Sequence, residues 1–180
     1  MNILILNWRD IKNPTAGGAE LLTHEIAKRW VKKGHSITQI SAGYNGGKKR
    51  EILDGVEIIR LGTWWTVHFL AMFYYLIKLR KKTDIIIDEV HWFPFFSKIY
   101  ANDKTILLAC ELAKDRFYEF FPAYLAMIWQ VIEKIYLYIY KDTPTFVISE
   151  STKDELVKEG MNKNKITVLP MGLTIPLSIK

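Results

Sequence analysis

Short apolar runs alternate with segments of helical periodicity along the chain. The apolar runs are rich in β-branched residues and predict strands over residues 3–6, 36–41, 56–61, 84–88, 105–110, 145–149 and 165–169. Helical periodicity predicts helices over residues 19–33, 65–82, 122–141 and 151–159. Strands that are apolar throughout and separated by helices are typical of a parallel sheet covered on both faces. The pattern therefore predicts an α/β fold with a Rossmann-like, doubly wound parallel sheet.

The first predicted helix is amphipathic, as in a helix that packs its apolar side on a core. Its apolar stripe consists of Leu22, Ile26 and Trp30, and its polar stripe consists of Glu20, His24, Lys28 and Lys32. Gly34 predicts the C-terminal end of this helix, because glycine readily adopts the left-handed conformation found there. Ser151 and Asp154 predict a capping box at the start of the last helix.

Composition excludes several classes of protein. Hydrophobic residues make up 49% of the 180 residues, which is too many for a disordered chain. The net charge of +6 is a mild excess and is not concentrated as in dedicated nucleic-acid binders. The single cysteine and the four scattered histidines lack the number and spacing of a metal site. We therefore expect no nucleic acid, no metal and no cofactor.

The sequence shows no pattern of a signal peptide and no apolar run of the roughly 18 residues that a spanning helix requires. The expected compartment is the cytoplasm, and the free thiol of Cys110 agrees with a reducing one.

The loop after the first predicted strand is a candidate anion site. Gly17 and Gly18 open the first helix, and their missing side chains allow a phosphate to approach the helix N-terminus. Arg9 adds a cationic fork. The alternative is a plain glycine turn in which Glu20 stabilises the helix N-terminus. The dinucleotide-binding pattern Gly-x-Gly-x-x-Gly is absent, which argues against an oxidoreductase on the same sheet.

Two further strand ends carry candidate chemistry. Asp88, Glu89 and His91 follow a buried strand, and groups of this kind bind sugar hydroxyls or transfer protons. The alternative is that Asp88 caps the following turn and His91 is an exposed loop residue. At the end of the next strand, Cys110 has no local base to activate it, which favours a buried inert thiol over a nucleophile.

The predicted helices at 65–82 and 122–141 are rich in aromatic residues. Each is apolar around more of its circumference than one contact with a sheet requires. The first ends in the basic residues Lys78, Arg80, Lys81 and Lys82. Tryptophan and tyrosine beside basic residues suit a membrane interface. The alternative is that this helix packs entirely against the sheet and shows only its charges.

Six blocks of sequence, in order along nearly the whole chain, resemble family 4 (group 1) glycosyltransferases. They are Asn7 to Glu20, Thr23 to Glu25, Asp88-Glu89 with Pro94 to Phe96, Glu111 to Ala113, Val147 to Lys153, and Lys165 to Gly172. The Gly-Gly-Ala-Glu block at residues 17–20 and the Ser-Glu-Ser-Thr-Lys block at residues 149–153 together are specific to the family.

The resemblance implies the N-terminal, acceptor-side domain of a GT-B enzyme, spanning residues 1–172. Residues 173–180 would begin an interdomain linker, and the C-terminal donor domain is absent. Such an enzyme transfers a sugar from a nucleotide sugar to a hydroxyl of a lipid-linked or saccharide acceptor, with retention of configuration and without a metal. A hexosyltransferase type is expected, and the isolated chain is expected to be inactive. The acceptor gives a reason for peripheral contact with an anionic membrane.

The resemblance also implies roles for individual residues. Gly17 and Gly18 would lie by the donor's phosphates, and Cys110 and Glu111 would lie at the donor sugar. Relatives often carry a histidine where this chain has Cys110, so the contact with the sugar differs here. The candidates around the acceptor or sugar are Arg9, Glu20, Glu89 and His91.

A second function agrees with the same sequence. The chain would then be a non-catalytic half-enzyme, a binding module that docks a separate subunit carrying the donor site.

Overall fold

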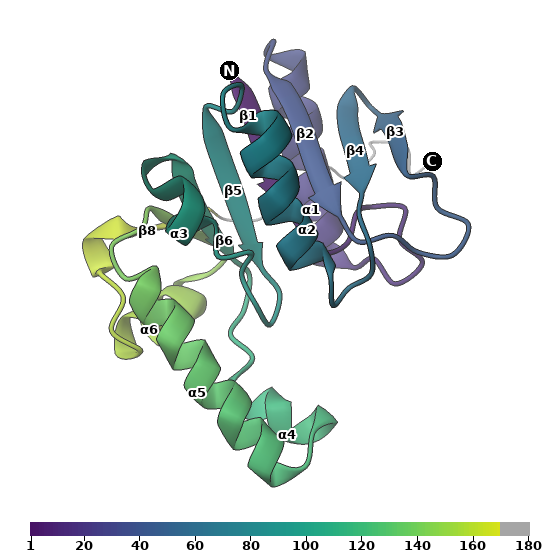
Figure 1. The fold of residues 1–180 in the computed structure, drawn as a ribbon. Coiled ribbons are helices and arrows are strands. Elements are labelled where there is room, and N and C mark those ends of the chain that lie inside the picture. The colour runs from purple at the N-terminus through teal and green to yellow at the C-terminus, as the bar shows by residue number, and fades with distance from the viewer. Residues whose placement is uncertain (170–180) are drawn as a thin grey trace, which may run out of the picture.

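The computed structural model describes residues 1–169, and within them eight strands form one sheet in the order β3-β4-β2-β1-β5-β6-β7-β8 (Figure 1). The strands are β1 (Asn2–Leu6), β2 (Ser36–Ser41), β3 (Arg50–Leu53), β4 (Val56–Arg60), β5 (Ile85–Val90), β6 (Thr105–Ala109), β7 (Thr145–Val147) and β8 (Ile166–Val168). All neighbouring strands are parallel except β3, which is antiparallel to β4. The predicted Rossmann-like α/β fold is confirmed. The predicted linker at residues 173–180 lies outside the described residues.

Helices connect the strands. The α-helices are α1 (Gly18–Lys32), α2 (Val67–Tyr74), α3 (Ser97–Ala101), α4 (Phe117–Phe120), α5 (Ala123–Ile139) and α6 (Glu150–Lys158). A π-helical segment, η1 (Tyr75–Leu79), continues α2, and short 3₁₀ turns are found at η2 (Asn102–Lys104), η3 (Lys114–Arg116) and η4 (Lys163–Lys165). The predicted helix at residues 65–82 is therefore shorter than expected and changes its winding after Tyr74.

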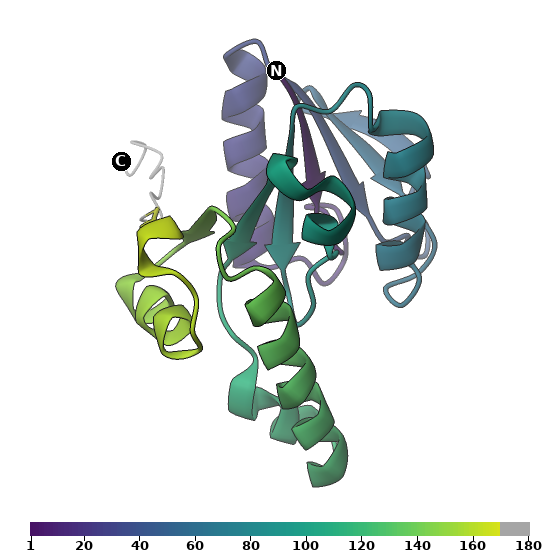
Figure 2. The same ribbon diagram turned by 60° about the vertical axis from the view of Figure 1, so that its left-hand side comes forward.

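The sheet is buried on both faces, as its apolar strands predict. Successive side chains of a strand point to opposite faces. In β1, Ile5 packs with Ala27 of α1, whereas Leu6 packs with Val67 of α2. Figure 2 shows the sheet between these two helices. The same alternation explains why β1 has no polar position between Ile3 and Leu6.

Helix α1 packs on the sheet with a face that its apolar stripe does not indicate. Its buried residues are Glu20, Thr23, His24 and Ala27, so two members of the predicted polar stripe face inward. Buried polar groups cost little when they are hydrogen-bonded. Here the carboxyl group of Glu20 accepts from the Gly17 N–H, and the His24 Nε2 lies 2.9 Å from a carboxylate oxygen of Asp54. Gly34 has a φ of +84°, as expected just after the helix end.

The edge of the sheet carries a hairpin that the sequence analysis missed. Strands β3 and β4 are joined by the two residues Asp54 and Gly55, both with positive φ. Asp-Gly is a strong hairpin signal, because both central residues of this turn type require positive φ. The signal was therefore present in the sequence.

The N-cap of helix α6 lies two residues before the start of the predicted capping box. Its N-cap is Ser149, whose Oγ accepts a hydrogen bond from the Thr152 N–H. The prediction of Ser151 with Asp154 is therefore wrong, because Ser151 already lies within the first turn of α6.

Two helices present apolar side chains to the surface. Helix α5 projects beyond the sheet, with α4 beside its outer end (Figures 1 and 2). The exposed stripe of α5 consists of Tyr124, Met127, Ile128, Val131, Ile135 and Tyr138. On α2 and η1, Phe69, Phe73 and Ile77 are exposed by 67%, 54% and 73%. The alternative that this helix packs entirely against the sheet is therefore wrong.

Candidate functional site

The candidate site lies where the strand order reverses. From β1 the chain continues outward through β2 and β4, and from β5 it continues in the opposite direction through β6, β7 and β8. Strands β1 and β5 are neighbours, with Leu6 paired to Asp88. Ligands of doubly wound folds bind beyond the carboxyl ends of the strands at such a reversal. Asn7 and Glu89 are the next residues along each strand, so the fold brings them together.

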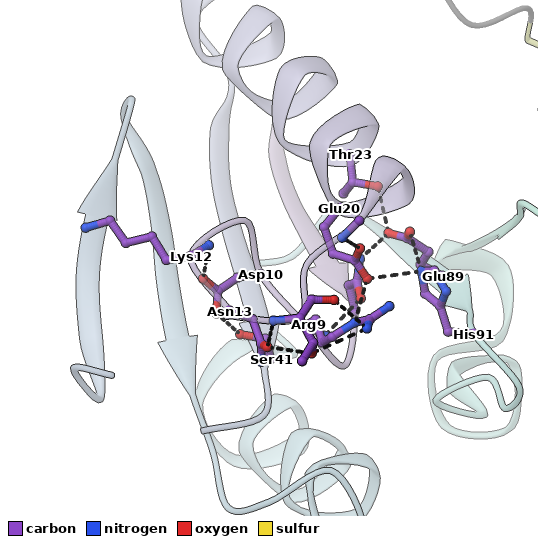
Figure 3. A network of polar contacts seen from close by, with 12 residues as sticks. Arg9, Asp10, Lys12, Asn13, Glu20, Thr23, Ser41, Glu89 and His91 are labelled. Carbon is purple, nitrogen blue, oxygen red and sulfur yellow. Dashed lines mark hydrogen bonds and ion pairs between the residues drawn. The ribbon is translucent and has the colours of Figure 1, made fainter. Parts of the chain in front are cut away.

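Glu89 is the centre of a buried hydrogen-bond network (Figure 3). Its Oε2 accepts from the Asn7 Nδ2 and from the Thr23 Oγ1, both at 2.7 Å. Its Oε1 lies 3.0 Å from the Nε2 of His91. Glu89 and Asn7 are completely buried. The network thus fixes the carboxyl group from three sides, with one partner just after β1, one on α1 and one in the loop after β5.

A second carboxyl group lies next to the same histidine. The Oε1 of Glu20 lies 3.7 Å from the His91 Nε2 and accepts a hydrogen bond of 2.9 Å from the Arg9 Nε. His91 therefore lies between two buried carboxyl groups (Figure 3). Its side chain is 12% exposed, so the alternative of an exposed loop histidine is wrong. Together Glu20, Glu89, His91 and Arg9 form what we call the carboxyl cluster.

The loop between β1 and α1, residues 7–17, is called the glycine loop, and it ends directly beside the carboxyl cluster. The Gly17 N–H donates to the Oε2 of Glu20 at 2.6 Å, so Glu20 caps α1 as one of the two sequence interpretations predicted. Gly17 has an extended backbone with a φ of −126°. Around Gly18, a Cβ atom would meet no heavy atom within 4 Å. The helix N-terminus is thus open at Gly18, whereas the Gly17 N–H has an internal partner.

Arg9 is held by its own loop. Besides its bond to Glu20, its Nη1 donates to the carbonyl oxygen of Thr15 at 2.7 Å. Its guanidinium lies 4.4 Å from the centre of the Trp8 ring. These contacts fix the orientation of the planar group, and they use part of the cationic fork that the sequence analysis assigned to a phosphate.

Cys110 and Glu111 occupy different surroundings although they are adjacent. Cys110 follows β6 and is buried; burial, together with the negative charges of Glu89, Glu111 and Glu20, raises the pKa of its thiol to about 12. The thiol is therefore unreactive at neutral pH, as the sequence analysis favoured. The Glu111 side chain is 61% exposed and pairs with Arg116. The charges of Glu89 and Glu20 act on the Cys110 thiol, so Cys110 is near the carboxyl cluster.

Asp88 positions the loop that carries His91. Its carboxyl group accepts from the backbone N–H groups of Phe95 and Ser97 at 2.8 and 2.9 Å, and from the hydroxyl of Tyr140 at 2.6 Å. Burial raises the pKa of Asp88 above its ordinary value. The alternative role, in which Asp88 caps the following turn, is therefore the observed one.

A buried ion pair that the sequence analysis missed anchors the other end of the glycine loop. The Arg60 Nε and Nη2 donate to the two carboxylate oxygens of Asp10 at 2.7 and 2.6 Å, and Ser41 adds a third bond to Asp10. Asp10 and Arg60 are 50 positions apart, and the pairing of β1 with β2 and of β2 with β4 brings them together. No local sequence pattern contains this information.

Among residues 1–169, no group of three or more His, Cys, Asp or Glu side chains is arranged as a set of metal ligands. No helix in the same residues has the length and hydropathy to cross a membrane.

The structure is a Rossmann-like domain with a buried polar cluster at its strand-order reversal. A family model described as Glycosyltransferase Family 4 matches residues 16–175 of the chain. The protein therefore belongs to glycosyltransferase family 4. A search among curated proteins finds no match.

Proposed function

We propose that this domain binds the acceptor in a glycosyltransferase that moves a sugar from a nucleotide sugar to an acceptor hydroxyl with retention of configuration. The observation that carries the proposal is the carboxyl cluster at the strand-order reversal of a family 4 domain. A partly exposed imidazole held by two buried carboxyl groups is suited to a hydrogen bond with a sugar hydroxyl. Because the Nε2 of His91 is engaged by Glu89, Nδ1 is the ring nitrogen available to a ligand.

The electrostatics of the cluster favour hydroxyls over phosphates. Glu20 and Glu89 are both buried there, and the nearest cation, Arg9, is already paired with Glu20. A diphosphate leaving group requires cationic or N–H stabilisation. We propose that most of this stabilisation comes from a second, C-terminal domain, and that the open helix N-terminus at Gly18 contributes the rest. On this account the 180 residues alone do not turn over a nucleotide sugar, and the reaction requires no metal.

The acceptor is proposed to be lipid-linked or a saccharide, and the domain is proposed to work in the cytoplasm at the surface of an anionic membrane. The support is the exposed apolar stripe of α2 and η1, with Phe69, Phe73 and Ile77, together with the exposed basic residues that follow it. An apolar stripe beside cations is the arrangement of interfacial helices.

The experiment compares the 180-residue chain with the complete polypeptide that its reading frame encodes. Both are incubated with UDP-, GDP- and dTDP-sugars and a panel of lipid-linked and saccharide acceptors, and nucleotide release is measured. Turnover is expected from the complete polypeptide alone, and Glu89→Gln should reduce it at least tenfold. The matched control, Glu155→Gln, changes a carboxylate that is 44% exposed on α6 and should leave the rate unchanged.

Two results would contradict the proposal. Robust turnover by the 180 residues would show that no second domain is required. Equal effects of the two Glu→Gln substitutions would show that the carboxyl cluster has no role in the reaction. A reading frame that ends at residue 180 would favour instead the half-enzyme that docks a separate donor-binding subunit.

A further inference from the structure

We propose that an apolar cavity between α2, the loop after β5 and α5 binds the hydrocarbon chain of the acceptor lipid. This inference rests on the proposed function, because it assigns the chain to the apolar part of that acceptor. The cavity has a volume of about 470 Å³, which lies within the range of about 300–1,000 Å³ typical of small-molecule sites.

The walls of the cavity are almost entirely aromatic and aliphatic. Trp64 and Phe69 come from the start of the α2 region, Phe93 from the loop after β5, and Trp129 and Ile132 from α5. No lining residue carries a permanent charge. The one titratable lining residue, His68, is stacked on Phe95 with ring centres 4.4 Å apart, and burial lowers its pKa to about 4. The cavity is therefore uncharged at neutral pH and suits an apolar body.

One short turn joins the lining of the cavity to the carboxyl cluster. The Phe93 N–H donates to the carbonyl oxygen of His91 at 2.8 Å, so the two residues lie at the ends of the same tight turn. His91 faces Glu89 and Glu20, whereas Phe93 packs edge-on against Trp129 with ring centres 4.8 Å apart. A molecule with a hydroxyl-bearing head at His91 therefore has an apolar surface directly beside that head.

This arrangement favours an amphiphile over other occupants. A saccharide would use the carboxyl cluster and leave the cavity empty. A partner helix or a second copy of the chain would cover the exposed Phe69 and Phe73 alike, because these residues lie one turn apart on α2 and are both exposed. A single chain in the cavity would contact Phe69, which lines it, and not Phe73.

Tryptophan fluorescence provides the test. Three of the six tryptophans, Trp64, Trp65 and Trp129, line the cavity. The 180-residue chain is titrated with ω-bromododecyl β-glucoside below its critical micelle concentration, because the bromine quenches only nearby indoles. Saturable quenching with one binding site is expected. Replacing the glucosyl head by phosphate on the same chain distinguishes recognition of the chain from recognition of the head.

Phe69→Glu and Phe73→Glu are the matched variants. Both substitutions place a carboxylate at an exposed position of α2, so both proteins should fold, and thermal unfolding checks this. The glucoside affinity is expected to fall at least tenfold in Phe69→Glu and less than twofold in Phe73→Glu. Equal losses, unsaturable quenching, or quenching that requires vesicles would overturn the cavity site, and so would a dimer in sedimentation whose formation abolishes quenching.

The outcomes also separate this inference from the proposed function. Chain binding without glycosyl transfer by the complete polypeptide would contradict the proposed function and leave the cavity as an amphiphile site. Glycosyl transfer to a lipid-linked acceptor that is insensitive to Phe69→Glu would contradict the cavity site alone.

Discussion

The side-chain amide of Asn7 donates a hydrogen bond of 2.7 Å to the Oε2 of Glu89, a residue 82 positions away in the sequence. Both residues are completely buried at the adjoining ends of β1 and β5. The bond closes the polar site where the two halves of the sheet meet. It also fixes one face of the carboxyl group that holds His91.

The contribution of this network to stability can be measured at Thr23, whose hydroxyl donates to the same Oε2 of Glu89 as Asn7. Thr23→Val keeps the shape of the side chain and removes the donor, so a buried acceptor loses a partner. The free energy of unfolding should fall by about 1–3 kcal/mol. Thr38→Val is the control, because the Thr38 hydroxyl donates to the partly exposed Glu57. Urea unfolding of the two variants should give clearly different midpoints; similar midpoints would show that the network contributes little.

Gly18→Ala separates folding from function at the open helix N-terminus. An added Cβ meets no atom within 4 Å, and alanine is favoured over glycine in helices by ~0.5–1 kcal/mol. We therefore expect a stability equal to or above that of the wild type and a weaker affinity of the complete polypeptide for nucleotide sugar. Gly34→Ala is the control. It should lower stability, because Gly34 has positive φ, and it should leave donor affinity unchanged, because Gly34 lies outside the site. Unchanged donor affinity in Gly18→Ala would mean that no phosphate approaches this position.

Arg60→Met should be strongly destabilising. It leaves the buried carboxylate of Asp10 with Ser41 as its remaining side-chain donor, and breaking a buried pair in this way typically costs about 3–5 kcal/mol. Arg50→Met is the control, because its pair with Glu57 is exposed to solvent and should shift the urea midpoint little. If the two substitutions had similar effects, the Asp10–Arg60 pair would not be the anchor of the glycine loop.

Because of His68, we predict that stability decreases as the pH falls below neutral. Burial lowers the pKa of its imidazole from 6.5 to about 4, so the folded state favours the neutral ring. The stabilisation is complete above pH 6.5 and is lost as the pH falls from 6.5 towards 4. For the wild type this amounts to roughly 3 kcal/mol.

His68→Phe isolates that contribution. Asp88 and Glu133, whose pKa values are raised by burial, act in the opposite direction in both proteins. The difference in thermal midpoint between wild type and His68→Phe should therefore move in favour of the variant between pH 7 and pH 4.5. A difference that is independent of pH would show that His68 is solvated.

From the basic residues after η1 we predict that the domain binds anionic membranes. Co-sedimentation with vesicles should rise with the content of anionic lipid and fall with added salt, which screens exposed charges. The double substitution Lys81→Glu with Lys82→Glu should weaken binding, since each basic residue contributes ~1 kcal/mol near such a surface. The same charge change at Lys153 and Lys158 on α6 is the control. Absence of binding at low salt to strongly anionic vesicles would contradict peripheral membrane contact.

The fold could be predicted from the sequence because its signals are local. Ile3 to Leu6 is apolar at every position, which requires burial on both faces and hence helices on both sides. The Asp54-Gly55 hairpin was equally local and was overlooked. The face of α1 could not be predicted, because the burial of Glu20 and His24 depends on partners that the sheet and a distant turn supply.

The site could be predicted only as separate pieces. Glu89 and His91 were candidates because they follow a buried strand, and Glu20 because it follows the glycines. That all three form one cluster follows from the position of β1 next to β5, which hydropathy does not encode. The cavity was beyond prediction for the same reason, since Phe69, Phe93 and Trp129 come from three separate segments.

Two consecutive residues of the glycine loop form ion pairs with different elements. Arg9 pairs with Glu20 of α1, and Asp10 pairs with Arg60 of β4. Displacing the loop would break a buried ion pair. At ~3 kcal/mol, such an open state would be populated in about one molecule in 150. The loop is therefore pre-organised and does not close over a substrate as a lid. If the proposed function holds, a closing motion would have to come from another part of the complete polypeptide, and it would meet a surface that is already in its final shape.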